Sequence, residues 1–346
     1  MRSVIVVHPE FDRTWPFGIE RLLQLVKQDG PVELIRLDAF AQSIVGDVVD
    51  QPETVDRLFS LNAEITTSCL EKFTSLKEAV IECTFQRALP KPEIIEALNR
   101  LNIRWYTQPT EGFWSQSVSE FALGLTICGL RRIPQLHHDI IQSQKPWDYD
   151  VPGGIGAPGG RGFQFGDDTR FTNGTVEGKR VRIVGAGNIA SRYASFVHML
   201  GADVAAWDPF ATEPSFHRAG ARKEWHLDRL IKEAEIFVPM LPLTTETNGI
   251  ITSEHINALP KGTLVVLATR AEICDMNALR KRVLEDELCL AADVFDIEPL
   301  PLSDPLLGRP NVIHTPHNAG RTKDANYRFI EKLYEQFLPL ANKERS

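Results

Sequence analysis

The sequence predicts an α/β protein with two doubly wound parallel sheets. Short apolar runs alternate with helical patterns over about the first hundred residues, and the same rhythm returns between Lys179 and about residue 316. This alternation is typical of parallel sheets whose two faces are covered by helices. The chain has 346 residues, of which 43% are hydrophobic, so it can form two domains with cores of their own.

The first region is expected to contain three strands and three helices. Apolar runs predict strands at 4–7, 32–37 and 79–81. Apolar residues at helical spacing predict helices at 19–27, 92–99 and 117–132. Ser117 or Ser119 can cap the start of the third helix, and Glu120 suits the positive end of its dipole.

The second region repeats the pattern on a larger scale. Apolar runs predict strands at 180–184, 203–207, 236–238, 264–267, 291–294 and 312–314, and helices are expected at 188–200 and 323–340. The segment 146–178 is different, because its glycine-rich run at 153–160 follows no strand and precedes no helix. We interpret 146–178 as an extended surface loop, either a lid or an arm toward a second subunit.

Composition and charge narrow the class of protein. The formal net charge is -8, which argues against nucleic acid or an anionic membrane as the main partner. The longest apolar stretch, 121–130, has about half of the roughly 20 residues that a membrane-spanning helix requires. The apolar run at 4–7 is too short for a signal peptide. Five scattered cysteines without a Cys-x-x-Cys pair indicate a reducing cytoplasm, and neither a disulfide framework nor a metal site is indicated.

A glycine-containing turn follows the first strand of the second region and predicts a dinucleotide site. Gly185 permits a tight turn, and Gly187 lets the backbone approach a pyrophosphate. Ala190 stands in place of a third glycine and is small enough for the helix to pack on the strand. The free N–H groups at the helix start, around Asn188 and Ile189, would then face the phosphates.

Asp208 ends the next strand, at the spacing that the dinucleotide pattern requires. A carboxylate at this position accepts hydrogen bonds from ribose hydroxyls and repels a 2′-phosphate, so NAD is favoured over NADP. Two alternatives stay open at this point. A nearby arginine could offset the charge and admit NADP, or the glycine turn and Asp208 could simply be parts of a structural loop.

Three polar residues follow later strands of the second region: Arg270, Glu298 and His317. Ligands bind outside the carboxyl ends of the strands in an open α/β sheet, so these side chains are expected at one site. Arg270 can hold a carboxylate through paired hydrogen bonds and polarise the neighbouring carbonyl. His317 can exchange a proton with the carbonyl oxygen, and Glu298 can orient the imidazole through its other nitrogen. Each residue type alone is more often structural or solvated, and the ordered combination predicts reduction of a 2-oxo acid.

Several ordered motifs resemble the D-isomer-specific 2-hydroxyacid dehydrogenase family, from about Leu76 onward. The matching segments are 117–125, 185–190, 241–247, 269–275, 292–300 and 315–317. The resemblance implies an NAD-dependent, D-stereospecific oxidoreductase that acts on a small 2-hydroxy or 2-oxo acid. It also implies a Rossmann cofactor domain at 113–319, inserted in a flavodoxin-like substrate domain made of 1–112 and 320–346. A homodimer formed largely through the cofactor domains is implied as well.

The resemblance assigns roles to individual residues. Arg270, Glu298 and His317 would be the catalytic residues, and His317 would also lie beside the cofactor. Asp293 would contact the nicotinamide carboxamide. The remaining cofactor contacts implied in this way are Pro242, Thr247, Ala268 and Thr269.

The sequence departs from the family pattern in three places. Ala190 replaces the last glycine of the turn, and Ala271 follows the catalytic arginine where glycine is usual. More importantly, the loop at 82–87 lacks the glycine-rich sequence with which the family presents backbone N–H groups to the substrate carboxylate. The arginine of this loop could add a second anion contact or could simply be solvated. The candidate substrate contacts in the loop are Cys83, Thr84, Phe85 and Arg87.

Other functions are compatible with the same fold. One is a dehydrogenase of formate, phosphite, or a phosphorylated or sugar-derived acid, and another is an NAD-binding regulator that resembles a corepressor. The arginine, glutamate and histidine favour oxo-acid chemistry, because formate oxidation removes no proton from a hydroxyl group. A regulator should have a recruitment groove and little need for His317, and no sequence feature marks such a groove.

Overall fold

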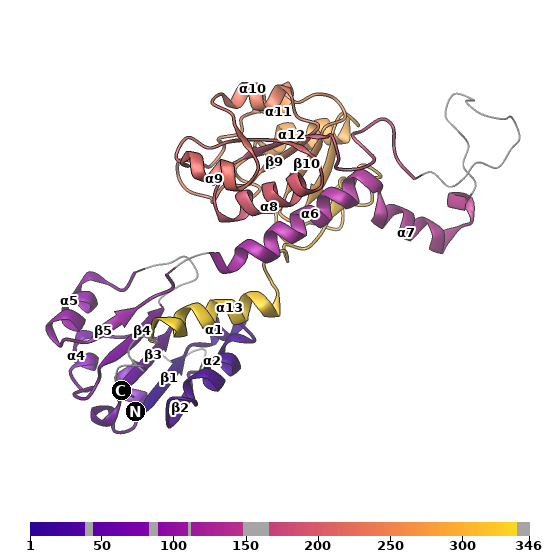
Figure 1. Cartoon of the computed structure of the whole chain (residues 1–346). Helices are drawn as coiled ribbons and strands as arrows, with labels where there is room; N and C mark the ends of the chain where they lie inside the picture. The colour runs from indigo at the N-terminus through magenta and orange to yellow at the C-terminus, as the bar shows by residue number, and fades with distance from the viewer. Residues whose placement is uncertain (39–43, 83–88, 110–111, 148–165, 338–346) are drawn as a thin grey trace, which may run out of the picture. The chain divides into compact units, whose positions relative to one another are not determined.

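The computed structural model describes residues 1–38, 44–82, 89–109, 112–147 and 166–337. The chain divides into two compact units, one of Met1–Phe113 with Arg321–Ser346 and the other of Trp114–Gly320. Each unit contains a parallel sheet with helices packed on it (Figure 1). The predicted fold class, two doubly wound α/β sheets, is therefore confirmed.

The first unit has five parallel strands in the order β2-β1-β3-β4-β5. Its strands are β1 Ser3–Val7, β2 Val32–Arg36, β3 Arg57–Leu61, β4 Glu78–Glu82 and β5 Arg104–Tyr106. Its helices are α1 Pro9–Thr14, α2 Gly18–Val26, α3 Val45–Val48, α4 Thr67–Leu70, α5 Pro92–Arg100 and α13 Lys323–Tyr334. Every residue of β1, β3 and β4 is buried, as expected for strands with both faces covered. The strand order is that of flavodoxin-like sheets.

Helix α13 brings the end of the chain back to the first unit, where it packs beside α2 (Figure 1). Its buried Phe329 stacks on Trp15 with ring centroids 4.1 Å apart and meets Phe113 edge-on at 5.1 Å. The side-chain oxygen of Asn326 accepts a hydrogen bond of 3.2 Å from the backbone N–H of Phe17. The core of the first unit is thus built from both ends of the sequence.

A buried arginine fixes the far end of α13. Arg57 is fully buried at the start of β3, where its guanidinium is 2.8 Å from Asp29 and 4.2 Å from the ring centre of Phe337. The hydroxyl of Tyr334 donates a 2.8 Å hydrogen bond to the same Asp29 carboxylate. A buried charge is tolerated only when it is paired, so these contacts join the helix end to the sheet.

The second unit has seven parallel strands in the order β12-β11-β10-β9-β6-β7-β8. They are β6 Arg180–Val184, β7 Asp203–Trp207, β8 Arg222–Lys223, β9 Ile236–Pro239, β10 Leu264–Leu267, β11 Cys289–Ala292 and β12 Val312–His314. Its helices are α6 Ser115–Arg131, α7 Ile133–Gln142, α8 Asn188–Met199, α9 Glu213–Arg218, α10 Leu227–Lys232, α11 Ser253–Ala258 and α12 Met276–Leu284. The order of connection reverses between β6 and β9, which is the topological switch point where doubly wound sheets bind ligands.

Polar contacts join α6 to α8 inside the core of the second unit. The buried hydroxyl of Ser119 on α6 donates a 2.9 Å hydrogen bond to the carbonyl of Ile189 in the first turn of α8. About one turn further along α8, the phenol of Tyr193 is 2.8 Å from the hydroxyl of Thr126. Burial raises the pKa of this phenol, which therefore stays neutral. These bonds fix the position of α8, whose first turn forms part of the candidate site.

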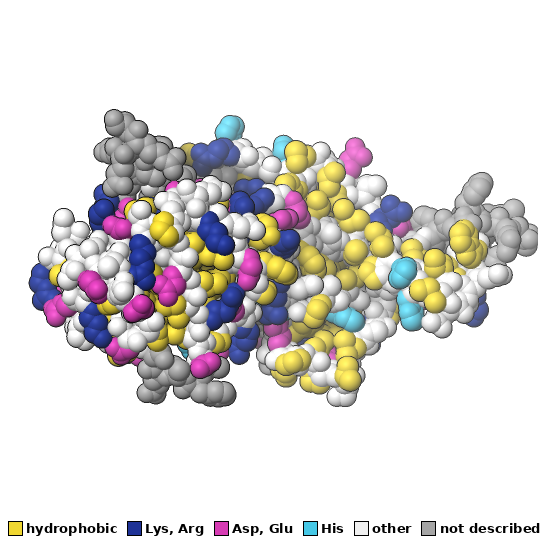
Figure 2. Space-filling view, turned by 90° about the horizontal axis from the view of Figure 1, so that it is seen from below, with side chains coloured by type: hydrophobic (Ala, Val, Ile, Leu, Met, Phe, Trp, Pro, Cys, Tyr) yellow, Lys and Arg dark blue, Asp and Glu magenta, His cyan; other side chains and the backbone are white. Residues whose placement is uncertain are grey.

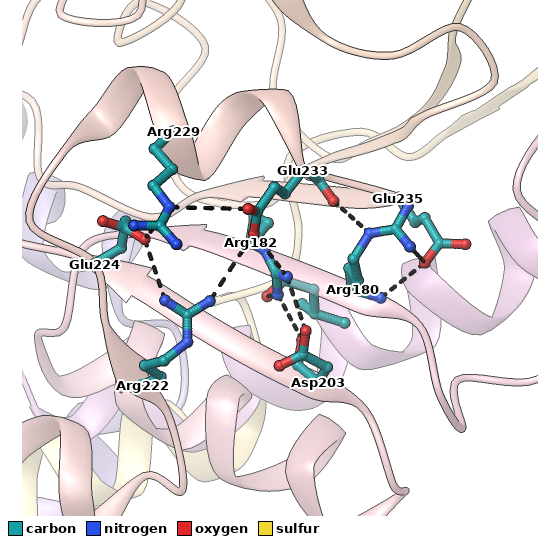
Figure 3. Close-up of polar contacts among 9 residues, drawn as sticks. Arg180, Arg182, Asp203, Arg222, Glu224, Arg229, Glu233 and Glu235 are labelled. Atoms are coloured by element: carbon teal, nitrogen blue, oxygen red, sulfur yellow. Dashed lines mark hydrogen bonds and ion pairs between the residues drawn. The ribbon is translucent and has the colours of Figure 1, made fainter.

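A network of charged residues holds the opposite, amino-terminal part of this sheet. Arg182 of β6 is buried, and its guanidinium lies 2.8 Å from Asp203 at the start of β7 and 3.4 Å from Glu233 just after α10. Figure 3 shows these contacts continuing to further residues on or next to β6, β8, β9 and α10, namely Arg180, Arg222, Glu224, Arg229 and Glu235. The network ties three strands and a helix together and contains none of the candidate catalytic residues.

The structure contains elements that the sequence pattern did not predict. Strand β3 was missed because the polar residues Arg57 and Ser60 interrupt its apolar run, although both are buried. Helix α7 was also missed, although its residues Ile133, Leu136 and Ile140 recur at helical spacing. Strand β11 begins and ends two residues before the predicted 291–294, because it pairs residue by residue with β10 from Cys289 onward.

The expected loop at 146–178 is described only in part. Residues 148–165, which include the glycine-rich run, lie outside the described residues. Residues 166–178 contain turns and bends, with no helix or strand. Within the described ranges, no helix is long and apolar enough to cross a membrane.

Replacing Phe329 with alanine should destabilise the first unit by about 3–5 kcal/mol, because the change leaves a cavity among aromatic rings. Urea unfolding followed by tryptophan fluorescence would measure the effect, since Trp15 reports on this cluster. The neighbouring exposed Arg328→Ala should change the free energy of unfolding by no more than about 0.5 kcal/mol. Equal effects of the two substitutions would show that α13 is not part of the core.

Candidate active site

The turn after β6 places Gly185 where a larger residue does not fit. Its φ is +110°, and a Cβ atom there would lie 2.6 Å from the carbonyl oxygen of Met240, the residue after β9. Since β6 and β9 are neighbours in the sheet, the two chain segments meet at the switch point. The glycine is therefore required by the close approach of the two backbones.

The first turn of α8 is open to an anion. Gly187 is the N-cap residue, and no side chain accepts a hydrogen bond there from the first N–H groups of the helix. A Cβ atom on Gly187 would meet nothing within 4 Å, so the space in front of Asn188 and Ile189 is free in the structure. Unpaired N–H groups and the positive end of the helix dipole favour a phosphate at such a position. Ala190 is buried, as expected for packing against the sheet.

Asp208 follows β7 and is fixed beside the glycine turn. One carboxylate oxygen accepts a 2.8 Å hydrogen bond from the backbone N–H of Ala186, within the turn itself. The other oxygen accepts from the N–H groups of Phe210 and Ala211 at 2.9 and 3.0 Å. The oxygen that accepts from Ala186 keeps a further lone pair that a hydroxyl group could use. The carboxylate thus both shapes the turn and places a negative charge next to it.

The loops after β9 and β10 contain the next group of expected cofactor contacts. Thr247 closes the exposed loop after β9, since its hydroxyl donates to the carbonyl of Pro242 and accepts a 2.8 Å hydrogen bond from the N–H of Thr244. Ala268 and Thr269 follow β10 directly and are buried. Both loops leave the carboxyl ends of strands that adjoin the switch point.

Arg270 follows Thr269 and is partly buried. One terminal nitrogen of its guanidinium donates a 2.7 Å hydrogen bond to the carbonyl of Thr269. Among the described residues, this is the one polar contact found for the side chain. Its remaining N–H groups are therefore free to bind a carboxylate in the planar, paired geometry that suits arginine.

Asp293 follows β11, and its fully buried side chain holds the turn after β12. Its two oxygens accept hydrogen bonds from the hydroxyl of Thr315 at 2.6 Å and from the N–H groups of Asn318 and Ala319 at 3.0 and 2.8 Å. Between these contacts lies His317, whose φ of +52° is unusual for a residue other than glycine. The carboxylate therefore stabilises the backbone conformation that presents the histidine.

His317 and Glu298 are in direct contact. The Nδ1 atom of His317 is 2.7 Å from one carboxylate oxygen of Glu298, and the other oxygen accepts a 2.9 Å hydrogen bond from the N–H of Phe295. Both side chains are about one-third exposed, at 36% and 35%. The carboxylate fixes the imidazole ring through Nδ1 and leaves Nε2 available to a ligand.

The structure thus brings three of the expected residues, Asp293, Glu298 and His317, to the ends of two adjacent strands. Arg270 follows the next strand of the same sheet. Thr315 was not singled out from the sequence, although its position directly after a buried strand and close to His317 is a usable signal. The four candidate substrate contacts Cys83, Thr84, Phe85 and Arg87 lie outside the described residues.

The doubly wound sheet of the second unit and its glycine turn at Gly185 together define a dinucleotide-binding protein. Comparison with known proteins agrees with this class. Residues 158–319 match the NAD binding domain of D-isomer specific 2-hydroxyacid dehydrogenases. The chain is 28% identical over 320 residues to D-3-phosphoglycerate dehydrogenase of Bacillus subtilis, covering 91% of this chain and 55% of that protein. It is 31% identical over 235 residues to glyoxylate reductase of Thermofilum pendens, covering 65% and 62%. The chain thus spans about half to three-fifths of the length of these two relatives.

Solved structures share the fold over nearly the whole chain. An NAD-complexed D-isomer specific 2-hydroxyacid dehydrogenase from Lactobacillus delbrueckii superimposes with a TM-score of 0.68 at 18% identity, covering 99% of this chain and 98% of that one. A phosphoglycerate oxidoreductase from Rhizobium etli gives 0.72 at 17% identity, covering 99% and 96%.

The second unit therefore contains the NAD binding domain of the D-isomer-specific 2-hydroxyacid dehydrogenase family, and its cofactor is NAD. The residues of the site fit this cofactor. The glycine turn and the open first turn of α8 suit the pyrophosphate, and the carboxylate of Asp208 suits ribose hydroxyls.

The two glycines of the turn should respond differently to alanine. Gly185→Ala should lower the melting temperature of the cofactor-free protein by several degrees and weaken NADH binding, because its Cβ would contact the backbone of Met240. Gly187→Ala should leave the melting temperature unchanged, because its φ is -73° and the space is empty, yet weaken NADH binding at least about tenfold. Thermal unfolding and NADH fluorescence titration would measure both. Unchanged NADH affinity in Gly187→Ala would place the pyrophosphate elsewhere.

Proposed function

We propose that the protein transfers a hydride between NAD(H) and a small 2-hydroxy or 2-oxo acid, with D stereospecificity. The observation that supports this most directly is the 2.7 Å contact between His317 and Glu298 at the carboxyl edge of the cofactor-binding sheet. A histidine whose Nδ1 is held by a carboxylate is suited to give and take a proton at Nε2. Formate oxidation has no hydroxyl proton to remove and would not need this pair.

His317 would act as the general acid in reduction. When NADH is bound, it supplies the hydride that adds to the carbonyl carbon of the oxo acid. The carbonyl oxygen then takes a proton from Nε2 of His317, and the ring remains neutral with its Nδ1 proton directed at Glu298. In the reverse direction His317 accepts the hydroxyl proton, and the Glu298 carboxylate stabilises the resulting imidazolium. Asp293 contributes by fixing the turn that presents the histidine.

Arg270 would hold the carboxylate of the acid. Its guanidinium uses one N–H group for the carbonyl of Thr269 and has others to offer in a planar pair. A carboxylate held in this way would leave the adjoining carbonyl carbon where a hydride can reach it. The cofactor contacts proposed for Pro242, Thr247, Ala268, Thr269 and Asp293 are consistent with their positions in loops at the same sheet edge.

We assign the substrate role to the first unit and the cofactor role to the second, Trp114–Gly320. The family match at residues 158–319 supports the second assignment. The proposed substrate contacts of the first unit are Cys83, Thr84, Phe85 and Arg87. The curated relatives are named for phosphoglycerate and glyoxylate, so small oxo acids with and without phosphate are the first candidates. The cytoplasm is the proposed location.

An NADH-oxidation screen tests the reaction, using glyoxylate, hydroxypyruvate and longer sugar-derived and phosphorylated oxo acids. At least one acid should be reduced, and His317→Ala should lower kcat for that acid by roughly 100-fold or more while NADH still binds. Equal turnover by His317→Ala and the unchanged protein would refute the acid role. A protein that binds NADH but reduces none of the acids would refute the proposed activity itself.

We also propose that the protein forms a homodimer through helix α7 of the cofactor unit. None of the ten residues of this helix is buried, and three isoleucines stand 48–66% exposed: Ile133, Ile140 and Ile141. Figure 2 shows hydrophobic and histidine side chains exposed together in this part of the second unit. A second copy of the chain would bury an apolar surface that water otherwise contacts.

Replacing Ile140 with aspartate should convert the dimer to monomers in analytical ultracentrifugation, without lowering the melting temperature of the monomer, because this residue is half exposed. Met199→Asp is the matched control, since Met199 is 72% exposed at the end of α8 and should leave the dimer intact. A monomeric unchanged protein, or dimers of both variants, would contradict the proposal.

A further inference from the structure

One guanidinium on helix α12 holds both ends of the loop that contains Glu298. Arg280 has a side chain that is only 14% exposed. Its Nε is 3.1 Å from a carboxylate oxygen of Asp296, and its two terminal nitrogens are 3.0 and 2.8 Å from the two oxygens of Asp304. Asp296 and Asp304 lie on either side of Glu298 in the sequence. The arginine therefore closes the segment 296–304 into a ring of polar contacts.

This loop has little else to fix it. Segment 296–304 contains no helix or strand, and most of its side chains are exposed, including Ile297 at 55% and Leu302 at 97%. Leu300 is the one residue of the segment that packs against the core of the second unit. Packing alone therefore does not determine where Glu298 lies, and the polar contacts at the two ends carry that role.

The clamp acts next to the carboxylate that contacts His317. One oxygen of Glu298 accepts from the N–H of Phe295, and Phe295 directly precedes Asp296. A displacement of Asp296 would therefore move the group that orients the Glu298 carboxylate. Without the guanidinium, Asp296 and Asp304 would also face each other as like charges, and their repulsion would open the loop.

The charges of the clamp persist at neutral pH. The hydrogen bonds from Arg280 hold the pKa of Asp304 below its ordinary value, and those bonds also raise the pKa of Arg280. A carboxyl group whose pKa is lowered on folding contributes stability at neutral pH, which is lost as the pH falls through the acid range. Across the working range of an enzyme the ion pair between Arg280 and Asp304 is thus intact.

We propose that Arg280 is a positioning residue that keeps Glu298 against His317 by clamping Asp296 and Asp304. The inference rests on the proposed function, in which Glu298 and His317 form the acid–base pair. Arg280 touches neither the substrate nor the cofactor in this role. Its planar fork is essential, because one point charge cannot bind both oxygens of Asp304 and also Asp296.

Two substitutions and a matched control test this role. Arg280→Gln removes the clamp, and Arg280→Lys keeps the charge without the fork. Arg282→Gln is the control, because Arg282 lies on the same helix and binds Glu287 at 2.9 Å and two backbone carbonyls, with no contact to segment 296–304. All three substitutions should lower the melting temperature. A loss of stability alone would therefore affect all three variants, whereas misplacement of Glu298 would affect only the two Arg280 variants.

The first measurement is the Nδ1 proton of His317, whose hydrogen bond to Glu298 gives a downfield signal in proton NMR of the NADH-bound protein. The signal is assigned by its absence in His317→Ala. Arg280→Gln should lose or broaden it, Arg280→Lys should retain part of it, and Arg282→Gln should retain all of it. Retention of the full signal in Arg280→Gln would overturn the inference, whether or not any oxo acid is reduced.

The second measurement is the rate with the best acid of the screen. Arg280→Gln should lower kcat roughly 10- to 100-fold with little change in KM or NADH affinity, because the misplaced group acts on proton transfer and not on binding. Arg280→Lys should recover part of the loss. Rates for Arg280→Gln equal to those for Arg282→Gln would also overturn the inference. Absence of any oxo-acid reduction by the unchanged protein would refute the proposed function alone, and the NMR signal would still decide the clamp.

Discussion

The buried carboxylate of Asp293 is the interaction on which the candidate site depends. A charge without exposure to water must be compensated by hydrogen bonds, and here three donors of one short turn supply them. The turn satisfies Asp293 in a conformation that gives His317 a positive φ. The cost of that backbone conformation is thus offset by the solvation of a buried charge. The position of His317 therefore depends on the hydrogen bonds that the turn makes with the buried Asp293.

The same sheet edge collects the other functional groups through parallel topology. Strands β6, β9, β10, β11 and β12 all point in one direction, so the residues that follow them emerge at one edge. Between β6 and β9 the backbones approach so closely that no residue larger than glycine fits at position 185. The opposite end of the sheet is held by the paired charges around Arg182 (Figure 3). This network contains none of the candidate catalytic residues that follow β10, β11 and β12.

Much of the strand arrangement could be predicted from the sequence, because the spacing of apolar residues indicates which residues are buried. The strands at 180–184, 203–207, 264–267 and 312–314 were predicted with their observed bounds. Strand β3 could not be found in this way, since a polar side chain such as Arg57 is compatible with a buried strand only when a partner from distant sequence, here Asp29, is known. The contact between Glu298 and His317 was expected, whereas the contacts of Asp293 with the turn and of Arg280 with two aspartates depend on side-chain geometry that a pattern of residues does not contain.

The return of α13 to the first unit has a consequence for synthesis on the ribosome. Residues of the first sheet emerge early, but the rings of Trp15 and Phe59 are covered only when Phe329 and Phe337 have left the exit tunnel. The second unit is contiguous in sequence and can complete its sheet before that moment. The second unit can therefore finish folding before the unit which begins the chain, the reverse of the usual amino-to-carboxyl order. During that interval the nascent chain presents an aromatic surface of the kind that chaperones bind.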